Sequence, residues 1–379
     1  MLKRRVLIFT TNPVHNAPRV IREIECLKEH FELVVTGETP PEDKSIRYIN
    51  SDHIKLSHLE YTLGKIFRVV TFGKVFMGKY PTTQRKIEKL LKEVNPELVI
   101  VHPGAFLPYF FNRKQKFKVV FNAHEFHPKE FEGDLRWKKT WGKIYDEIYK
   151  NYLPQVDLLI NVCDGIAKEC LNQYGKDSLV IPNAGIFRKE IAPHLKSLGK
   201  IRMIHHGVAI RERNLEVMIE LANSLGERFE LDLMLVYQDE KYYSQLKKLA
   251  KQSINVRLIP PVKFDEIVPF IHRYDMGLFL LPPVNFNYLH ALPNKFFEFV
   301  QARLAIAVGP SPEMASLVRK HNIGVVSEDF TKDSLQRELQ SITHESINTW
   351  KMASDKAASI LSADQYNQLY TQAVLNLIS

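Results

Sequence analysis

The sequence has few cysteines and no long apolar run. Its three cysteines, Cys26, Cys163 and Cys170, have an odd count and a spacing that suits neither a disulfide framework nor a metal motif. No stretch reaches the roughly 20 continuous apolar residues of a membrane-spanning helix. The apolar run that follows the first five residues covers only residues 6–9, too short for the core of a secretory signal peptide. We therefore expect reduced cysteines and a cytoplasmic protein.

Three other features are also missing. The sequence has no repeat of solenoid period and no low-complexity tract, which excludes repeat arrays. It has no aromatic-basic motif of a recognised nucleic-acid module, and its basic residues form no single stripe, so we expect no nucleic-acid partner. It also lacks an Asp-x-Asp pair in a metal-binding context, and we expect neither a metal nor a cofactor.

What is present is an ordinary globular composition with a basic excess. The 379 residues are 45% hydrophobic and 25% charged, and this length exceeds what one core usually organises, so two domains are expected. The net charge of +9 favours anionic partners. Residues 65–79 mix cations with aromatic side chains, a pattern that fits either a peripheral contact with anionic lipid or an ordinary amphipathic helix.

Short apolar runs alternate with helical spacings along the whole chain. Strands are expected at residues 5–9, 32–36, 98–101, 118–121, 157–160 and 179–181, and then at 202–206, 231–236, 256–258, 276–280 and 305–308. Helices are expected between them at residues 18–28, 87–94, 164–174, 214–225, 240–251, 265–272, 294–302 and 312–320. This alternation predicts an α/β fold with two mostly parallel, doubly wound sheets.

A polar stretch divides the two sets of elements. Residues 184–199 contain Gly185, Pro193 and Gly199 and read as a linker. The predicted domains are therefore residues 1–183 and 200–362, followed by an amphipathic helix in residues 363–379. Ligands of such sheets bind at the carboxyl ends of the strands.

Two motifs in the second half suggest chemistry. Gly207 follows a predicted strand, and Arg213 lies near the start of the next helix, where a guanidinium and a helix N-terminus favour an anionic group. The alternative is a solvated arginine. Further along, Glu298 lies among Phe297 and Phe299, and a carboxylate there is costly unless hydroxyls such as a ribose diol hydrogen-bond it. The alternative is a capping or surface glutamate on a core helix.

A third motif lies in the first half. His124 follows a predicted strand in the loop Asn122-Ala123-His124-Glu125. A histidine at the carboxyl end of a strand is a candidate for chemistry, and the alternative is a packed core histidine.

These segments together resemble GT-B glycosyltransferases of family 4. The run from Pro293 to Glu298, with the strands at 276–280 and 305–308, is similar to that family's donor-binding region. Gly207 with Arg213 resembles its glycine turn, the loop around His124 resembles its histidine-bearing loop, and residues 12–20 resemble the first loop of bacterial members that build surface polysaccharides. The resemblance implies two Rossmann-like domains facing across a cleft, with the last helix packing back towards the N-terminal domain.

The resemblance also implies an activity and a set of site residues. The activity is metal-independent, retaining transfer of a hexose from a nucleotide-diphosphate sugar to a glycan or lipid-linked acceptor, in the cytoplasm at the inner face of the cell membrane. Preorganised cations would stabilise the departing diphosphate. The implied residues are His124 and His290 in catalysis, Gly207, Arg213, Asn294, Lys295 and Glu298 for the donor, and Asn12, His15, Arg19 and Glu125 for the acceptor.

The sequence departs from the family pattern at three places. His290 stands where the paired acidic motif has its first glutamate, Val208 follows the glycine turn in place of a basic residue, and residues 12–18 contain no glycine. Two other functions therefore stay open at this point. One is a sugar-nucleotide epimerase of the same fold, and the other is a non-catalytic basic protein that binds nucleic acid or membrane.

Overall fold

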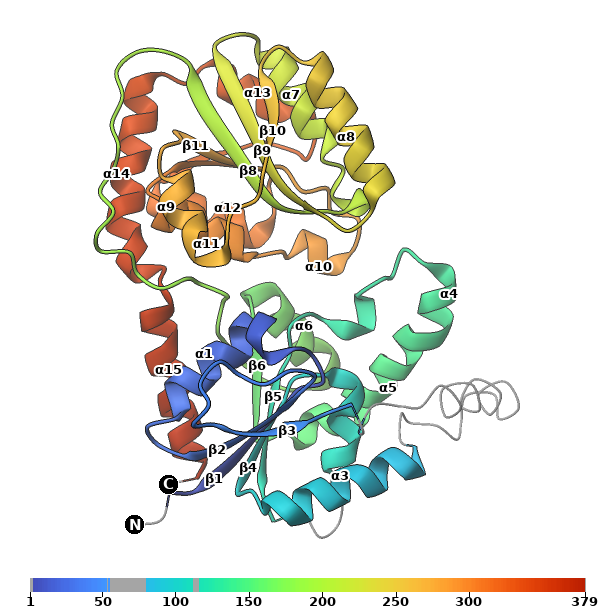
Figure 1. Cartoon of the computed structure of the whole chain (residues 1–379). Helices are drawn as coiled ribbons and strands as arrows, with labels where there is room; N and C mark the ends of the chain where they lie inside the picture. The colour runs from blue at the N-terminus through green and yellow to red at the C-terminus, as the bar shows by residue number, and fades with distance from the viewer. Residues whose placement is uncertain (1–2, 53, 55–79, 112–115, 379) are drawn as a thin grey trace. The chain divides into compact units, whose positions relative to one another are not determined.

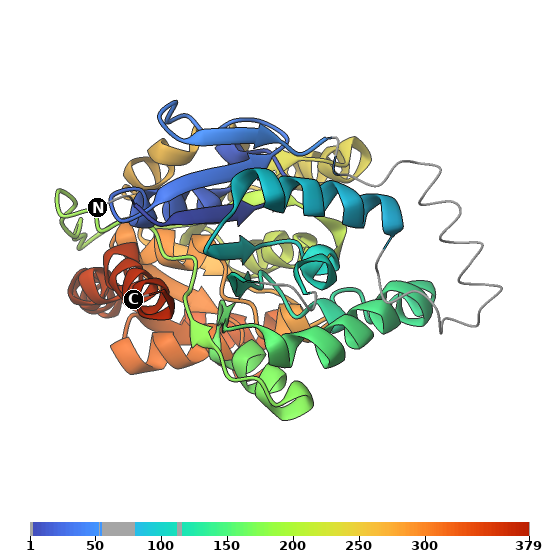
Figure 2. The same cartoon turned by 90° about the horizontal axis from the view of Figure 1, so that it is seen from below.

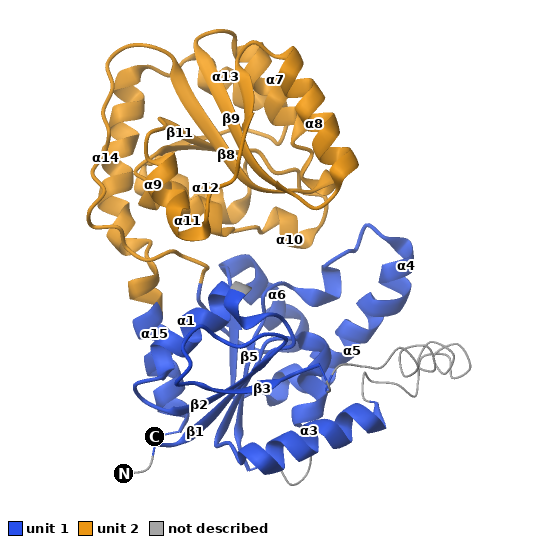
Figure 3. Cartoon of the chain, viewed as in Figure 1, with its two compact units in different colours: residues 1–181, 367–379 blue, residues 182–366 orange. Residues whose placement is uncertain are grey.

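A computed structural model describes residues 3–52, 54, 80–111 and 116–378, drawn as coloured ribbon in Figure 1. The chain forms two compact units, unit 1 with residues 1–181 and 367–379 and unit 2 with residues 182–366 (Figure 3). The predicted basic-aromatic segment, residues 65–79, lies outside the described residues.

Unit 1 contains a seven-stranded sheet in the order β3-β2-β1-β4-β5-β6-β7. All pairings are parallel, and β1 lies between β2 and β4. Every residue of β4 is buried, as expected for a strand covered on both faces. The strands are β1 (Arg5–Phe9), β2 (Glu32–Gly37), β3 (Arg47–Asn50), β4 (Leu98–Val101), β5 (Lys118–Asn122), β6 (Leu158–Asn161) and β7 (Leu179–Val180).

Helices connect these strands, and the last helix of the chain returns to them. The hydroxyl of Thr371 in this helix donates a hydrogen bond to the carbonyl oxygen of Cys26 in α1 at 3.5 Å. The two ends of the sequence therefore meet in unit 1 (Figures 1 and 2). The described helices are α1 (Pro18–Leu27), α3 (Pro81–Val94), α4 (Leu135–Trp137), α5 (Lys143–Tyr152), α6 (Asp164–Tyr174) and α15 (Ala363–Leu377), of which α15 begins in unit 2.

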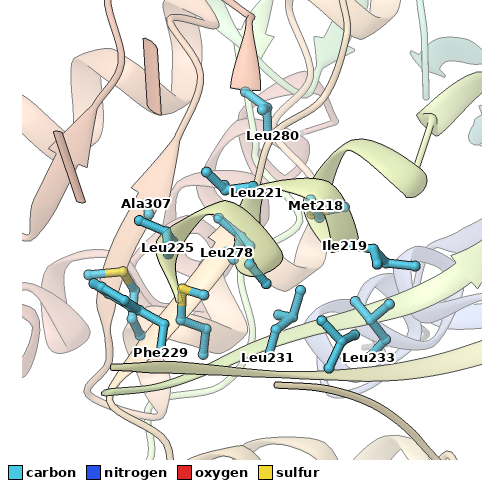
Figure 4. Close-up of a cluster of buried hydrophobic side chains, with 14 of the residues drawn as sticks. Met218, Ile219, Leu221, Leu225, Phe229, Leu231, Leu233, Leu278, Leu280 and Ala307 are labelled. Atoms are coloured by element: carbon cyan, nitrogen blue, oxygen red, sulfur yellow. The ribbon is translucent and has the colours of Figure 1, made fainter. Parts of the chain in front are cut away.

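Unit 2 contains a six-stranded parallel sheet in the order β10-β9-β8-β11-β12-β13. Figure 4 shows one face of its core, where Met218, Leu221 and Leu225 of α7 meet Leu231 and Leu233 of β9. The strands are β8 (Ile201–Ala209), β9 (Phe229–Tyr237), β10 (Val256–Ile259), β11 (Met276–Phe279), β12 (Ala305–Val308) and β13 (Gly324–Val326).

A second buried cluster fills the other part of the core of unit 2, and α11 supplies four of its residues, Phe296, Phe297, Phe299 and Val300. The helices of unit 2 are α7 (Glu216–Leu225), α8 (Glu240–Gln252), α9 (Ile267–Ile271), α10 (Phe286–Leu289), α11 (Asn294–Gln301), α12 (Pro312–His321), α13 (Lys332–Gln340) and α14 (His344–Ile360).

The α/β fold with two parallel, helix-covered sheets confirms the expected fold class. The edge strands β3 and β13 were not expected from the sequence, because their burial is only partial and their apolar runs are short. Residues 184–199, expected to be a linker, lie in unit 2. There the backbone N–H groups of Arg188 and Lys196 donate to the side chains of Gln301 and Asn348, at 3.0 and 3.1 Å.

Candidate functional site

The candidate site in unit 2 begins with the position of α11. Pro293 caps this helix with an extended backbone, and Asn294, half-buried, is its first residue. Gly277 of β11 gives the helix room, since a Cβ there would stand 2.3 Å from Cγ of Phe299. The helix therefore lies close against the sheet, with Lys295 and Glu298 only 6% and 7% exposed.

Lys295 lies against the end of β8. Its Nζ is 3.3 Å from Nε2 of His205 and 4.4 Å from the centre of the Phe279 ring. His205 bonds the carbonyl oxygen of Leu278 through Nδ1, at 2.9 Å, which leaves Nε2 as the acceptor for the lysine. The side chain thus has a fixed direction.

Gly207 brings a second cation to the same place. Its φ of +128° is a conformation that favours glycine, and a Cβ there would stand 3.0 Å from Nζ of Lys295 and 3.7 Å from Nη1 of Arg213. Arg213 is held by a 2.9 Å bond to the carbonyl oxygen of Val208. Two cationic side chains therefore lie beside the half-buried backbone at Gly207.

This arrangement disfavours the charged form of Lys295. Burial, followed by the neighbouring Arg213, holds the pKa of Lys295 well below its ordinary value, and Glu298 opposes that effect. A bound anion would relieve both the repulsion between the two cations and the desolvation of the lysine. The cluster consequently favours a ligand with negative charge at this point.

Glu298 lies one turn further along α11. Burial raises its pKa to about 7, against the opposing effect of Lys295. Nε2 of His206 lies 3.2 Å from Oε2 of Glu298, and burial lowers the pKa of His206 to about 3, so the ring brings no charge. This close contact lacks hydrogen-bond geometry, and within the described residues no other N–H or O–H donates a hydrogen bond to the carboxylate. A ligand with two hydroxyls would supply the missing donors.

His290 lies at the end of α10 and is joined to α12. Its Nδ1 is 3.0 Å from Oε1 of Glu313, and its ring centre is 4.6 Å from that of Phe286. Ser311, just before α12, bonds the carbonyl oxygen of Leu289 at 2.9 Å. The position at which the family pattern has an acid therefore carries a histidine paired with an acid from another helix.

In unit 1, His124 is the end of a buried hydrogen-bonded row at the carboxyl edge of the sheet. Its Nε2 is 2.9 Å from Nδ1 of His102, which directly follows β4. Nε2 of His102 is 2.7 Å from Oε2 of Glu23 in α1, and Nδ2 of Asn122 donates to Oε1 of Glu23 at 2.6 Å. Glu23, His102 and Asn122 are all at most 4% exposed.

The four residues predicted to contact an acceptor take different places in unit 1. Arg19, buried in α1, lies with Nη1 3.5 Å from the carbonyl oxygen of Ala123, and burial lowers its pKa to about 9. Glu125 is exposed beside His124. Asn12 and His15 are exposed in the loop before α1, where the His15 ring bonds the Thr39 hydroxyl at 2.6 Å. Arg19 and Glu125 thus lie next to His124, whereas Asn12 and His15 contact the segment that follows β2.

Sequence reasoning missed four residues that complete these clusters: Glu23, His102, His205 and Glu313. Only His205 carried a local signal, because it directly precedes the His206-Gly207 pair. The other three find their partners through contacts between residues far apart in the sequence.

Among the described residues, no three histidine, cysteine or acidic side chains gather as a metal-binding group. No helix in the same residues is both long and apolar enough to cross a membrane.

Comparisons with known proteins relate the chain to others through its structure. No protein-family model and no curated protein matches the sequence. Sucrose-phosphate synthase from Thermosynechococcus elongatus is similar over 99% of both chains, with a TM-score of 0.75 and 10% identity. WaaG, a glycosyltransferase involved in lipopolysaccharide biosynthesis, covers 97% of this chain and 99% of its own, with a TM-score of 0.65 and 13% identity.

A third similar structure is a mutant of S. aureus TarM in complex with fondaparinux, alpha-GlcNAc-glycerol and UDP. It covers 76% of this chain and 57% of its own, with a TM-score of 0.59 and 12% identity. The chain therefore has the GT-B fold that these solved glycosyltransferases share.

Proposed function

We propose that this protein is a glycosyltransferase that moves a sugar from a nucleotide-diphosphate sugar to a glycan or lipid-linked acceptor. The observation that carries the proposal is the cluster in unit 2, where Lys295 and Arg213 lie beside Gly207 and the buried Glu298 accepts no hydrogen bond among the described residues. A diphosphate matches the two cations, and a ribose diol matches the carboxylate.

The spacing within α11 supports one ligand for both groups. Lys295 and Glu298 are three residues apart, so both side chains leave the same face of the helix. A nucleoside diphosphate carries its diol and its phosphates on one short framework. In the TarM complex, a glycosyltransferase with this fold holds UDP.

The finer parts of the proposal follow the family resemblance. We propose retaining transfer of a hexose, without metal or other cofactor, in the synthesis of bacterial surface polysaccharide. His124 and His290 are proposed to act in catalysis, and Asn294 to contribute to the donor site. Asn12, His15, Arg19 and Glu125 are proposed to contact the acceptor. The net charge of +9 supports work at the anionic inner face of the cell membrane.

Isothermal titration with a panel of nucleoside diphosphates and their sugars tests the donor site. We expect one base to bind best, and Glu298→Ala to weaken that binding by ten-fold or more, the scale of a lost pair of hydrogen bonds to a charged group. Glu220→Ala, at an exposed position on α7 of the same unit, is the matched control. Nucleotide affinity that is equal in both variants would refute the donor site.

Turnover separates the transferase from the epimerase. With the preferred sugar nucleotide, a transferase releases the nucleoside diphosphate only when an acceptor is present. Conversion of the sugar nucleotide to an isomer without any acceptor would refute the transferase and favour the epimerase.

A further inference from the structure

The row from Glu23 to His124 has a defined pattern of protons. A carboxylate only accepts, and Glu23 accepts from Asn122 through Oε1 and from His102 through Oε2. Nε2 of His102 therefore carries a hydrogen. The remaining contact, between Nδ1 of His102 and Nε2 of His124 at 2.9 Å, holds a single proton that belongs to one ring or the other.

The position of that proton determines whether Nδ1 of His124 is a hydrogen-bond acceptor or carries a hydrogen. When the proton is on Nε2 of His124, His102 is neutral and Nδ1 of His124 is a bare acceptor. When the proton is on Nδ1 of His102, that ring is a cation and His124 carries its hydrogen on Nδ1. In the part of the chain that the structure describes, Nδ1 of His124 has no hydrogen-bond partner.

We propose that Glu23, His102 and His124 form a proton relay, in which a proton taken up at Nδ1 of His124 leaves its positive charge on His102. His124 would be the residue that touches the substrate, and Glu23 and His102 would be positioning residues. The identity of the substrate hydroxyl rests on the proposed function, whereas the relay itself does not.

The charges around the two rings favour a positive charge on His102 over one on His124. His124 faces Arg19, His102, His127 and Arg22, and burial, followed by Arg19 and His102, holds the pKa of His124 well below its ordinary value. His102 instead lies in contact with a carboxylate. A proton that charged His124 would therefore meet two arginines, whereas the same proton on His102 forms an ion pair with Glu23.

The surroundings of Glu23 keep it ionised. His102 holds the pKa of Glu23 below its ordinary value in spite of burial, and Asn122 acts in the same direction. Tyr370 of α15 also lies beside this carboxylate, and burial together with Glu23 raises the pKa of Tyr370 well above its ordinary value, so the phenol stays neutral. The ionised form of Glu23 behind His102 is thus favoured.

In a transfer reaction the steps balance as follows. The acceptor hydroxyl gives its proton to Nδ1 of His124 while its oxygen bonds the sugar carbon on the face from which the diphosphate leaves, so that the configuration of that carbon is retained. The bond from that carbon to the phosphate oxygen breaks, and both electrons leave with the nucleoside diphosphate. The proton on Nε2 of His124 moves to Nδ1 of His102 in the same event. Later loss of the Nδ1 proton of His124 to phosphate or water, with return of the Nδ1 proton of His102 to Nε2 of His124, restores the row.

Nitrogen-15 NMR of the histidine rings in the full chain tests the relay without any substrate. His102→Gln and His124→Gln identify the two sets of signals. As the pH falls, we expect His102 to gain a second N–H while His124 stays neutral and moves its hydrogen from Nε2 to Nδ1, with one midpoint for both rings. A doubly protonated His124, or two separate midpoints, would overturn the relay.

Steady-state kinetics of the His102→Gln variant test whether turnover uses the relay. The glutamine amide keeps a donor for Glu23 but removes the ring that stores the proton. We expect a loss of ten-fold to a hundred-fold in kcat, with KM for the sugar nucleotide within about two-fold, and a pH profile whose acid limb moves to lower pH because His124 must then carry the charge beside Arg19.

His30→Gln is the control, since His30 is exposed in the turn that follows α1 and bonds none of the members of the row. An unchanged acid limb in His102→Gln would refute the role of the relay in turnover. If no sugar nucleotide is turned over at all, the proposed function fails, and the NMR midpoints still decide whether the relay exists.

Discussion

Nζ of Lys295 lies 3.0 Å from the point where a Cβ on Gly207 would stand. The backbone of β8 at Gly207 and the side chain of Lys295 therefore pack too closely for a methyl group unless the lysine moves, and the glycine also has a φ of +128°. The position of the Lys295 ammonium therefore depends on the absence of a side chain at residue 207.

Gly207→Ala is expected to damage both stability and nucleotide binding. Backbone strain costs about 1–3 kcal/mol, and the new methyl group displaces Lys295. Gly226→Ala separates the two effects, because Gly226 has a φ of +73° and open space around its Cα. We expect chemical unfolding to show a loss in both variants and titration to show weaker nucleotide binding only in Gly207→Ala. Equal nucleotide affinity in the two would contradict the prediction.

Glu298→Gln is expected to stabilise the protein at alkaline pH while it weakens nucleotide binding. The folded pKa of about 7 exceeds the ordinary 4.5, so the folded state binds the proton more tightly and loses stability as pH rises between these values. At about 1.4 kcal/mol per pKa unit, the buried charge costs up to about 3 kcal/mol above pH 7.

Urea unfolding at two pH values measures this effect. The glutamine variant should exceed the wild type at pH 8 and approach it near pH 4.5. A stabilisation that is the same at both pH values would show that the charge of Glu298 is not its cause.

Glu313→Gln tests the pair between α10 and α12. If Glu313 orients His290 for catalysis, the amide should lower kcat by about ten-fold to a hundred-fold and leave nucleotide affinity within about two-fold. Steady-state kinetics and titration measure the two quantities. Glu345→Gln, at an exposed position in the first turn of α14, is the control, and a kcat equal to that control would remove His290 from the mechanism.

Gly277→Ala is expected to displace α11 from the sheet. The added Cβ would stand 2.3 Å from the ring of Phe299, and an overpacked core of this kind costs about 1–3 kcal/mol. Nucleotide binding should weaken as well, because Lys295 and Glu298 move with the helix. Gly185→Ala, with open space around it, should change neither the melting temperature nor the affinity. Unchanged nucleotide binding in Gly277→Ala would contradict this coupling.

Local pattern predicted much of the fold, and its failures share a cause. Strands such as β1 and β4 carry continuous apolar runs and were placed nearly to the residue. The helix α3 was expected only from residue 87, although it begins at Pro81, because its first turn is polar. The half-buried edge strands β3 and β13 gave too weak an apolar signal.

Some residues of the candidate sites could be predicted from the sequence, and others could not. Glu298 was predicted because apolar neighbours in the same helix make a carboxylate there unusual, whereas Lys295 was predicted from the family resemblance. Glu23 was missed because it lies on an ordinary amphipathic helix, and its partners His102 and Asn122 are 79 and 99 residues away. Nothing within reach of a short window marks such a residue, and only the topology of the parallel sheet brings the partners together.

The return of α15 to unit 1 has a consequence for how the chain is made. Tyr370 and Val374 are buried in unit 1, although residues 182–366 of unit 2 lie between them and the rest of that unit. During synthesis, unit 2 can complete its core before the ribosome has released the segment that finishes unit 1. Unit 1, although most of it is synthesised first, therefore completes its packing only after residues 367–379 have been added. These residues include Tyr370, which lies beside Glu23.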